Sequence, residues 1–239
     1  MSIIKIDGVT KNYKTKRALN GVTFSIEEGE LFGLLGVNGA GKTTLIKILC
    51  GLTKKNDGEV VLDGFNLDTQ IDEIKKIIDI SPQETSVANN LTVEENLRFF
   101  ANIYHENGDA IIDEVVEVFN LSDVLKQKAK TLSGGYKRRL SIAIALISKP
   151  KILFLDEPTL GLDVFARREL WGIIKKLKGS ITIILTSHYL EEIENLCDRV
   201  AILSSGRLLQ TGTIEELKQA TGAQTFEDAF IKLVEAHNE

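Results

Sequence analysis

Short apolar runs alternate with amphipathic stretches along much of the chain, which is typical of an α/β fold. Val22, Phe24 and Ile26 alternate with polar residues, a pattern that predicts a half-exposed antiparallel strand. Other short runs predict strands at residues 31–35, 59–62, 77–81, 152–155, 181–186, 200–204 and 207–211. The last two runs are separated by Ser205 and Gly206, so we expect them to form a hairpin.

Residues 84 to 148 have a different pattern, because helix formers dominate and no strand-like run occurs among them. Helices are predicted here at residues 92–104, 109–119, 124–128 and 134–148. Outside this segment, helices are predicted at residues 42–52, 164–176, 213–220 and 226–236. We therefore predict a single domain over residues 1–239, with an α/β core (1–83 and 150–220), an inserted helical lobe (84–149) and a C-terminal helical tail (221–239).

Composition and charge narrow the kinds of partner and compartment. The net charge of −5 argues against nucleic acid as a partner, because binding to its backbone relies on a basic face. No run approaches the roughly 18 apolar residues that cross a bilayer, and residues 1–16 lack a signal-peptide pattern, so we expect a soluble, cytoplasmic protein. Cys50 and Cys197 lie in apolar helical patterns. They could form a disulfide or remain two buried thiols, and a reducing cytoplasm favours the thiols.

A glycine-rich segment follows the strand at 31–35 and precedes the helix at 42–52. Residues 36–43 read GVNGAGKT and satisfy the phosphate-loop pattern in full. Lys42 would bind the outer phosphates of a nucleotide, Thr43 would ligate Mg²⁺, and Thr44 would bind an α-phosphate oxygen. Pattern and context together disfavour a plain glycine-rich turn. The residues expected to contact the nucleotide here are Gly36, Val37, Asn38, Gly39, Ala40, Gly41, Lys42, Thr43 and Thr44.

Two acidic residues end the apolar strand in ILFLDEP, residues 152–158. Ligands of open α/β sheets bind at this end of the strands. Asp156 would hold Mg²⁺, and Glu157 would point to the other side and orient or deprotonate an attacking water. A phosphate loop alone does not distinguish kinases, GTPases and ATPases, but a water-activating acid favours hydrolysis. The alternative, that these acids merely end a strand, is disfavoured by the phosphate loop upstream.

Residues 131–140 read TLSGGYKRRL and place small residues at the start of a predicted helix. The N-terminus of a helix contributes only about 0.3–1 kcal/mol to the binding of a nearby anion. Millimolar affinity already requires about 4 kcal/mol, so this helix start, with Ser133, Gly134 and Gly135 as donors, is suited to complete a nucleotide site, not to form one alone. Residues 137–139 face different sides of a helix, which favours ion pairs at the surface of the lobe or at a dimer seam.

Taken in order, these motifs resemble those of the nucleotide-binding subunit of an ATP-binding cassette (ABC) transporter, over nearly the whole chain. Residues 132–135 match the family signature, although Tyr136 follows where the family most often has glutamine. The resemblance adds four positions. Tyr13 would stack on adenine, and Asp163 would lie in the loop between subunits. Gln83, at the junction with the lobe, would be a catalytic residue and an Mg²⁺ ligand, and His188 would be a catalytic residue that contacts the γ-phosphate. Taken singly, Tyr13 would be an ordinary surface tyrosine and Asp163 a helix cap.

The resemblance implies a P-loop NTPase core with an antiparallel β subdomain and an inserted helical lobe. It also implies an Mg²⁺-dependent ATP hydrolase in which Ser133, Gly134, Gly135 and Tyr136 of one subunit close over ATP held by a second, with a homodimer expected. ATP would close the dimer and hydrolysis would reopen it. This cycle would drive an integral-membrane permease, which is a separate chain, while the subunit itself lies at the cytoplasmic face of the membrane. Rival interpretations are a chromosome-associated ATPase, a translation-associated cassette protein and a non-catalytic ATP-binding module.

Two stretches resemble the exporter branch of the family, whose cargoes are drugs, lipids, polysaccharides or ions. They read LTVEENLRFF (91–100) and TFEDAFIKLV (225–234). In the second stretch, Phe226, Phe230 and Leu233 recur at helical spacing, which is equally expected of a helix that packs its apolar face on the core.

Overall fold

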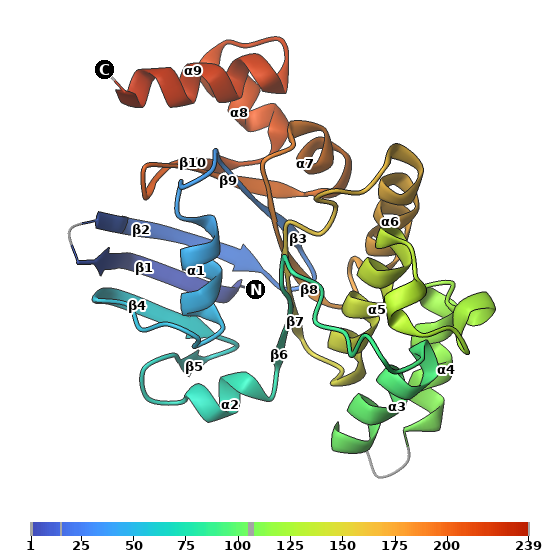
Figure 1. Ribbon diagram of the computed structural model, residues 1–239. Coiled ribbons are helices and arrows are strands. Elements are labelled where there is room, and N and C mark those ends of the chain that lie inside the picture. Colours follow the sequence, from blue (N-terminus) through green and yellow to red (C-terminus); the bar gives the residue numbers. More distant parts are fainter. Residues whose placement is uncertain (1, 15, 105–107, 239) are drawn as a thin grey trace.

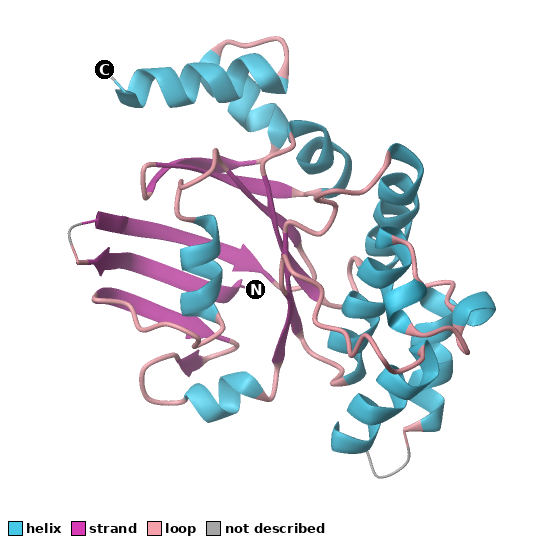
Figure 2. Cartoon of the chain, viewed as in Figure 1, coloured by secondary structure: helices cyan, strands magenta, loops and turns pink. Residues whose placement is uncertain are grey.

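The computed structural model describes residues 2–14, 16–104 and 108–238 and contains two β-sheets flanked by helices (Figures 1 and 2). The smaller sheet is antiparallel in the order β2-β1-β4-β5. Its strands are β1 (Ser2–Tyr13), β2 (Lys16–Glu27), β4 (Asp57–Leu62) and β5 (Phe65–Asn66). The alternation at Val22, Phe24 and Ile26 lies on β2, and all three side chains are buried, as the period of two predicts.

The larger sheet has the strand order β10-β9-β3-β8-β7-β6, in which all neighbours are parallel except the β9–β10 hairpin. Its strands are β3 (Leu31–Leu35), β6 (Ile78–Ser81), β7 (Ile152–Asp156), β8 (Thr182–Ser187), β9 (Arg199–Ser204) and β10 (Arg207–Gly212). Because β3, β7 and β8 are parallel neighbours, the loops that follow their carboxyl ends meet at one edge. This edge gathers the predicted phosphate loop, the two acids and the predicted histidine.

Helices cover both faces of the larger sheet. Those outside the predicted lobe are α1 (Lys42–Leu49), α2 (Ile71–Lys75), α6 (Val164–Leu177), α7 (Leu190–Leu196), α8 (Ile214–Thr221) and α9 (Phe226–Asn238). Helix α1 ends earlier than predicted, before Gly51, whose φ of 68° lies outside the helical region. The sequence did not predict β1 as a separate element, β5, α2 or α7.

Between β6 and β7 the chain forms the expected group of helices, drawn in green and yellow-green in Figure 1. They are α3 (Val93–Tyr104), α4 (Asp109–Val118) and α5 (Gly134–Ile147). The predicted helix at 124–128 is wrong. Ser122–Val124 forms a single 3₁₀ turn, and the carbonyls of Leu125 and Gln127 then accept hydrogen bonds from the first N–H groups of α3. Those N–H groups have no hydrogen-bond acceptor inside their own helix. The carbonyls of residues 125–127 therefore bond to α3 and do not form the hydrogen bonds of a helix of their own.

The larger sheet separates two apolar cores. Along β7, Leu153 and Leu155 belong to the core shared with the helical lobe. Ile152 and Phe154 belong to the other core, shared with α1 and the antiparallel sheet. Cys50 and Cys197 are free thiols, and burial raises the pKa of both. Among the described residues, no helix is both long enough and apolar enough to cross a membrane.

Candidate functional site

The loop between β3 and α1 can be built only with glycines at its close approaches. A Cβ at Gly36 would lie 2.4 Å from the carbonyl oxygen of Leu203. Gly41 has a φ of 110°, and a Cβ there would lie 2.8 Å from the carbonyl oxygen of Ala18. These constraints hold the loop against β2 and β9 and leave the first turn of α1 facing a cavity.

That cavity has a volume of about 370 Å³. It gathers predicted residues from distant parts of the sequence, together with Lys16, Ala18 and Leu160, which belong to no recognisable motif. Its lining comprises Tyr13, Lys16, Ala18, Asn38, Gly39, Ala40, Gly41, Lys42, Thr43, Thr44, Gln83, Glu157, Leu160 and His188. Gly36 and Val37 lie outside this lining and face a neighbouring recess.

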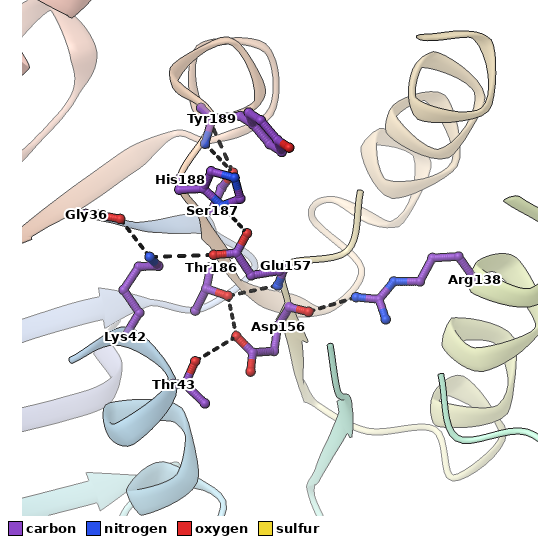
Figure 3. A network of polar contacts seen from close by, with 10 residues as sticks. All are labelled: Gly36, Lys42, Thr43, Arg138, Asp156, Glu157, Thr186, Ser187, His188 and Tyr189. Carbon is purple, nitrogen blue, oxygen red and sulfur yellow. Dashed lines mark hydrogen bonds and ion pairs between the residues drawn. The ribbon is translucent and has the colours of Figure 1, made fainter. Parts of the chain in front are cut away.

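Lys42 supplies a buried cation to the cavity. Its ammonium group donates to the carbonyl oxygen of Gly36 at 2.6 Å and lies 3.5 Å from Oε1 of Glu157 (Figure 3). Only 6% of the residue is exposed. A buried ammonium beside the N-terminus of α1 favours an anionic ligand, because the free N–H groups of the helix point the same way.

Asp156 lies behind the cavity, at the end of β7. Its Oδ1 accepts from the hydroxyl of Thr43 at 3.4 Å and from that of Thr186 at 2.6 Å. Carboxylate and hydroxyl oxygens are ligands that suit a hard cation such as Mg²⁺, so Asp156 and Thr43 have the chemistry to hold one. The sequence did not predict Thr186 as a site residue, since a threonine within an apolar strand belongs to no functional motif.

Glu157 adopts a left-handed backbone conformation, with φ at 49°, directly after β7. Such a conformation is uncommon for a residue with a side chain, and here two acceptors hold it. The N–H of Glu157 donates to both the carbonyl and the hydroxyl oxygen of Thr186, at 3.2 and 2.9 Å. The carboxylate turns into the cavity, where Oε2 lies 2.5 Å from Nδ1 of His188 (Figure 3). Glu157 therefore sits between a cation and an imidazole.

The predicted signature lies elsewhere. Within the part of the chain that the structure describes, neither Ser133–Gly135 nor Tyr136 lines the cavity. Ser133 caps α5, and its hydroxyl accepts from the N–H of Tyr136 at 3.4 Å. Gly135 packs closely on α6, since a Cβ there would lie 3.0 Å from that of Ala166. One copy of the chain thus does not bring its signature to its own phosphate loop.

The basic residues after the signature correct one expectation. Arg138 does not lie at the surface. It is buried, and its guanidinium donates to four backbone carbonyls, those of Pro82, Gln83, Asp156 and Pro158. Burial lowers its pKa to about 10. Arg139 does form an ion pair, with Glu169, and lies over the ring of Tyr136.

Asp163 is the N-cap of α6, which is one of the two roles that the sequence offered for it. Its Oδ1 accepts from the N–H groups of Phe165 and Ala166 at 2.9 and 3.0 Å. The cap fixes the loop before α6, so the loop enters the helix at a defined angle.

A family model described as "ABC transporter" matches residues 19–160, the part of the chain that carries the phosphate loop, the signature and both acids. The chain belongs to the ABC transporter family. The resemblance in the motifs is thereby confirmed, and with it the P-loop α/β fold. Members of this family bind and hydrolyse ATP and work in dimers with membrane permeases, so this chain is an ATP-binding subunit with ATP hydrolase activity. A non-transport role is not favoured.

Two curated relatives and one solved structure illustrate the family. The chain is 38% identical over 227 residues to the linearmycin resistance ATP-binding protein LnrL of Bacillus subtilis, covering 93% of this chain and 73% of that one. It is 37% identical over 223 residues to the daunorubicin resistance ATP-binding protein DrrA3 of Streptomyces coeruleorubidus, covering 92% and 71%. It also resembles a dimeric ATP-binding cassette in a post-hydrolysis state bound to ADP and Pi, with a TM-score of 0.78, 27% identity and coverage of 88% and 98%.

Proposed function

We propose that the cavity of this ABC subunit hydrolyses ATP with Glu157 as the general base. The observation that carries the proposal is the placement of the Glu157 carboxylate, 3.5 Å from the Lys42 ammonium and 2.5 Å from His188. Lys42 and the N-terminus of α1 would bind the phosphates, and Tyr13, which lines the same cavity, would stack on adenine. His188 would hold Glu157 in place and contact the γ-phosphate, while Glu157 takes a proton from the attacking water.

Mg²⁺ fits the donor groups beside the phosphate loop. The hydroxyl of Thr43 and the carboxylate of Asp156 already lie 3.4 Å apart, and Gln83 lines the same cavity. We infer that these three residues hold the ion, with Asp156 bound directly or through water. When bound, Mg²⁺ neutralises charge that develops on the transferred phosphate.

A second copy of the chain would complete the site. Ser133–Gly135 begins α5 away from its own cavity, and the N–H groups of a helix start can bind an anion. We infer that the signature closes over ATP held by the other copy, in a head-to-tail homodimer that reopens after hydrolysis. In this scheme residues 1–83 and 150–220 bind ATP, 84–149 carries the signature, 221–239 forms the tail, and Asp163 lies between the subunits.

The dimer would power an integral-membrane permease on a separate chain, from the cytoplasmic side. Relatives at 37–38% identity are named for resistance to linearmycin and daunorubicin, which supports export as the direction of transport. Phe99 and Ile103 on α3 are exposed and one helical turn apart, so the lobe offers an apolar surface to the permease.

The Glu157→Gln substitution tests the general base. We expect the variant to bind ATP, to lose at least about 100-fold in turnover and to accumulate as a dimer in MgATP, measured by nucleotide binding, phosphate release and sedimentation. Lys42→Ala should instead weaken ATP binding, and Glu28→Gln, which removes an exposed carboxylate, should behave as wild type. Hydrolysis by Glu157→Gln at the wild-type rate would refute the assignment.

A further inference from the structure

Phe165 is the most exposed large apolar side chain among the described residues, at 83%. It lies in the first turn of α6, two residues after Asp163, and Val164 beside it is also exposed. A phenylalanine ring in water is costly, and ring anchors of this kind carry much of the binding energy of protein interfaces. Phe165 is therefore placed to contact a partner.

The neighbours of Phe165 tie it to the signature. Gly135 packs against Ala166, the residue after Phe165, and Gly134 faces Leu162 just before α6. The starts of α5 and α6 are thus packed together, with the cap at Asp163 fixing the second. The first turn of α6, which carries Phe165, therefore lies beside the signature.

A recess of about 260 Å³ lies next to the cavity. It shares Asn38 and His188 with the cavity lining, so it adjoins the phosphate loop. An apolar cavity of about 150 Å³ can already hold a benzene ring. Among the described residues that line it, Val37, Leu190 and Phe230 are apolar, and none is an Asp, Glu, Lys or Arg. The full lining is Gly36, Val37, Asn38, His188, Leu190 and Phe230.

We propose that Phe165 of one copy inserts into the Val37–Leu190–Phe230 recess of a second copy of this chain. The inference rests on the proposed dimer: when a signature lies over the phosphate loop of the other copy, the adjacent Phe165 faces the recess beside that loop. A two-fold dimer forms this contact twice, since each copy carries both the anchor and the recess. The tail helix α9, through Phe230, then builds part of the dimer contact beside His188.

Dimer affinity in MgATP tests the anchor, in the Glu157→Gln background where hydrolysis does not reopen the dimer. Phe165→Ala should raise the dimer dissociation constant by about tenfold or more, and Phe165→Leu should recover most of the affinity. Phe99→Ala removes an exposed ring from α3 and should change the constant less than about twofold. If the parent forms no dimer, the proposed function and this inference both fail. If the Glu157→Gln parent dimerises and the added Phe165→Ala substitution leaves its dimer dissociation constant unchanged, only this inference fails.

Cysteine cross-linking tests the position of the contact. In the Glu157→Gln background, Phe165→Cys combined with Phe230→Cys should give a covalent dimer with a short bifunctional maleimide only when MgATP is present. The matched control combines Phe165→Cys with Ile231→Cys, since Ile231 is the next residue of α9 and does not line the recess. The native thiols react slowly because burial raises the pKa of Cys50 and Cys197. Equal cross-linking of both pairs, or none of the 165–230 pair in an ATP-bound dimer, would overturn the proposal.

Discussion

Buried polar side chains hold the loops around the ATP cavity in place. The guanidinium of Arg138 joins the signature helix to the loop of Gln83 and to the end of β7, through four carbonyls. Glu192 on α7 is fully buried, and its Oε1 accepts from the indole N–H of Trp171 at 3.1 Å. Burial raises the pKa of Glu192 above its ordinary value of 4.5. Both residues lie outside the cavity. Arg138 fixes the loop of Gln83, which lines the cavity, and Glu192 joins α7 to α6.

The raised pKa of Glu192 makes stability depend on pH. The folded chain keeps this proton at a higher pH than the unfolded chain does, so the free energy of unfolding falls as pH rises above 4.5 toward the folded pKa. Glu192→Gln keeps an oxygen for Trp171 and cannot ionise. We expect its stability relative to wild type to increase as the pH rises above 4.5, measured by urea unfolding at several pH values. Exposed Glu191→Gln is the control; a constant difference across pH would contradict the prediction.

Helix ends determine how the elements meet. Ser133, Asp163 and Thr213 each cap the helix that follows, and each accepts a hydrogen bond from an N–H of its first turn. Thr213 and Glu216 form a full capping box at α8, the short helix that connects β10 to the tail. These caps satisfy N–H groups that have no partner within the helix.

Removal of the cap at α8 should destabilise the protein measurably. Thr213→Ala leaves the N–H of Glu216 without its hydroxyl acceptor, which costs about 1 kcal/mol of the free energy of unfolding. Thr213→Ser keeps the hydroxyl and should lose much less. Urea denaturation of both variants provides the measurement, and equal losses would show that the methyl group, not the cap, is responsible.

At the scale of the whole molecule, the tail is part of the main apolar core. Phe226 and Ala229 of α9 are buried in the same core as β3, β7 and the helical lobe. Figure 1 shows α9 at the top, beside α8 and above β9 and β10. The expectation that the tail packs its apolar face on the core is confirmed. This packing also brings Phe230 to the recess beside the phosphate loop.

Truncation of the anchor of the tail tests this arrangement. Phe226 is 1% exposed, so Phe226→Ala removes a fully buried ring and should lower the free energy of unfolding by about 3–5 kcal/mol. Phe165→Ala removes a ring that is 83% exposed and should change it by less than about 0.5 kcal/mol. Thermal and urea unfolding of the two variants give the comparison; a small effect at Phe226 would mean that the tail packs more loosely than described.

The sequence by itself determined the local parts of this protein. The phosphate loop, the Asp156–Glu157 pair and most helices and strands are predictable, because glycine conformations, apolar runs and helical periodicity act over a few residues. The helix predicted at 124–128 failed because its carbonyls serve the N-terminus of α3, a contact between segments about 30 residues apart.

Only the tertiary structure decided which side chains meet. Thr186 holds Asp156, Arg138 binds backbone carbonyls, and Phe230 reaches the recess beside Val37. No local sequence pattern predicts these contacts. Each joins residues that are far apart along the chain and that meet only because of the order in which the strands are arranged in the sheet. Hydrogen bonds and burial depend on position in space, and the packing of the sheet and its helices fixes that position.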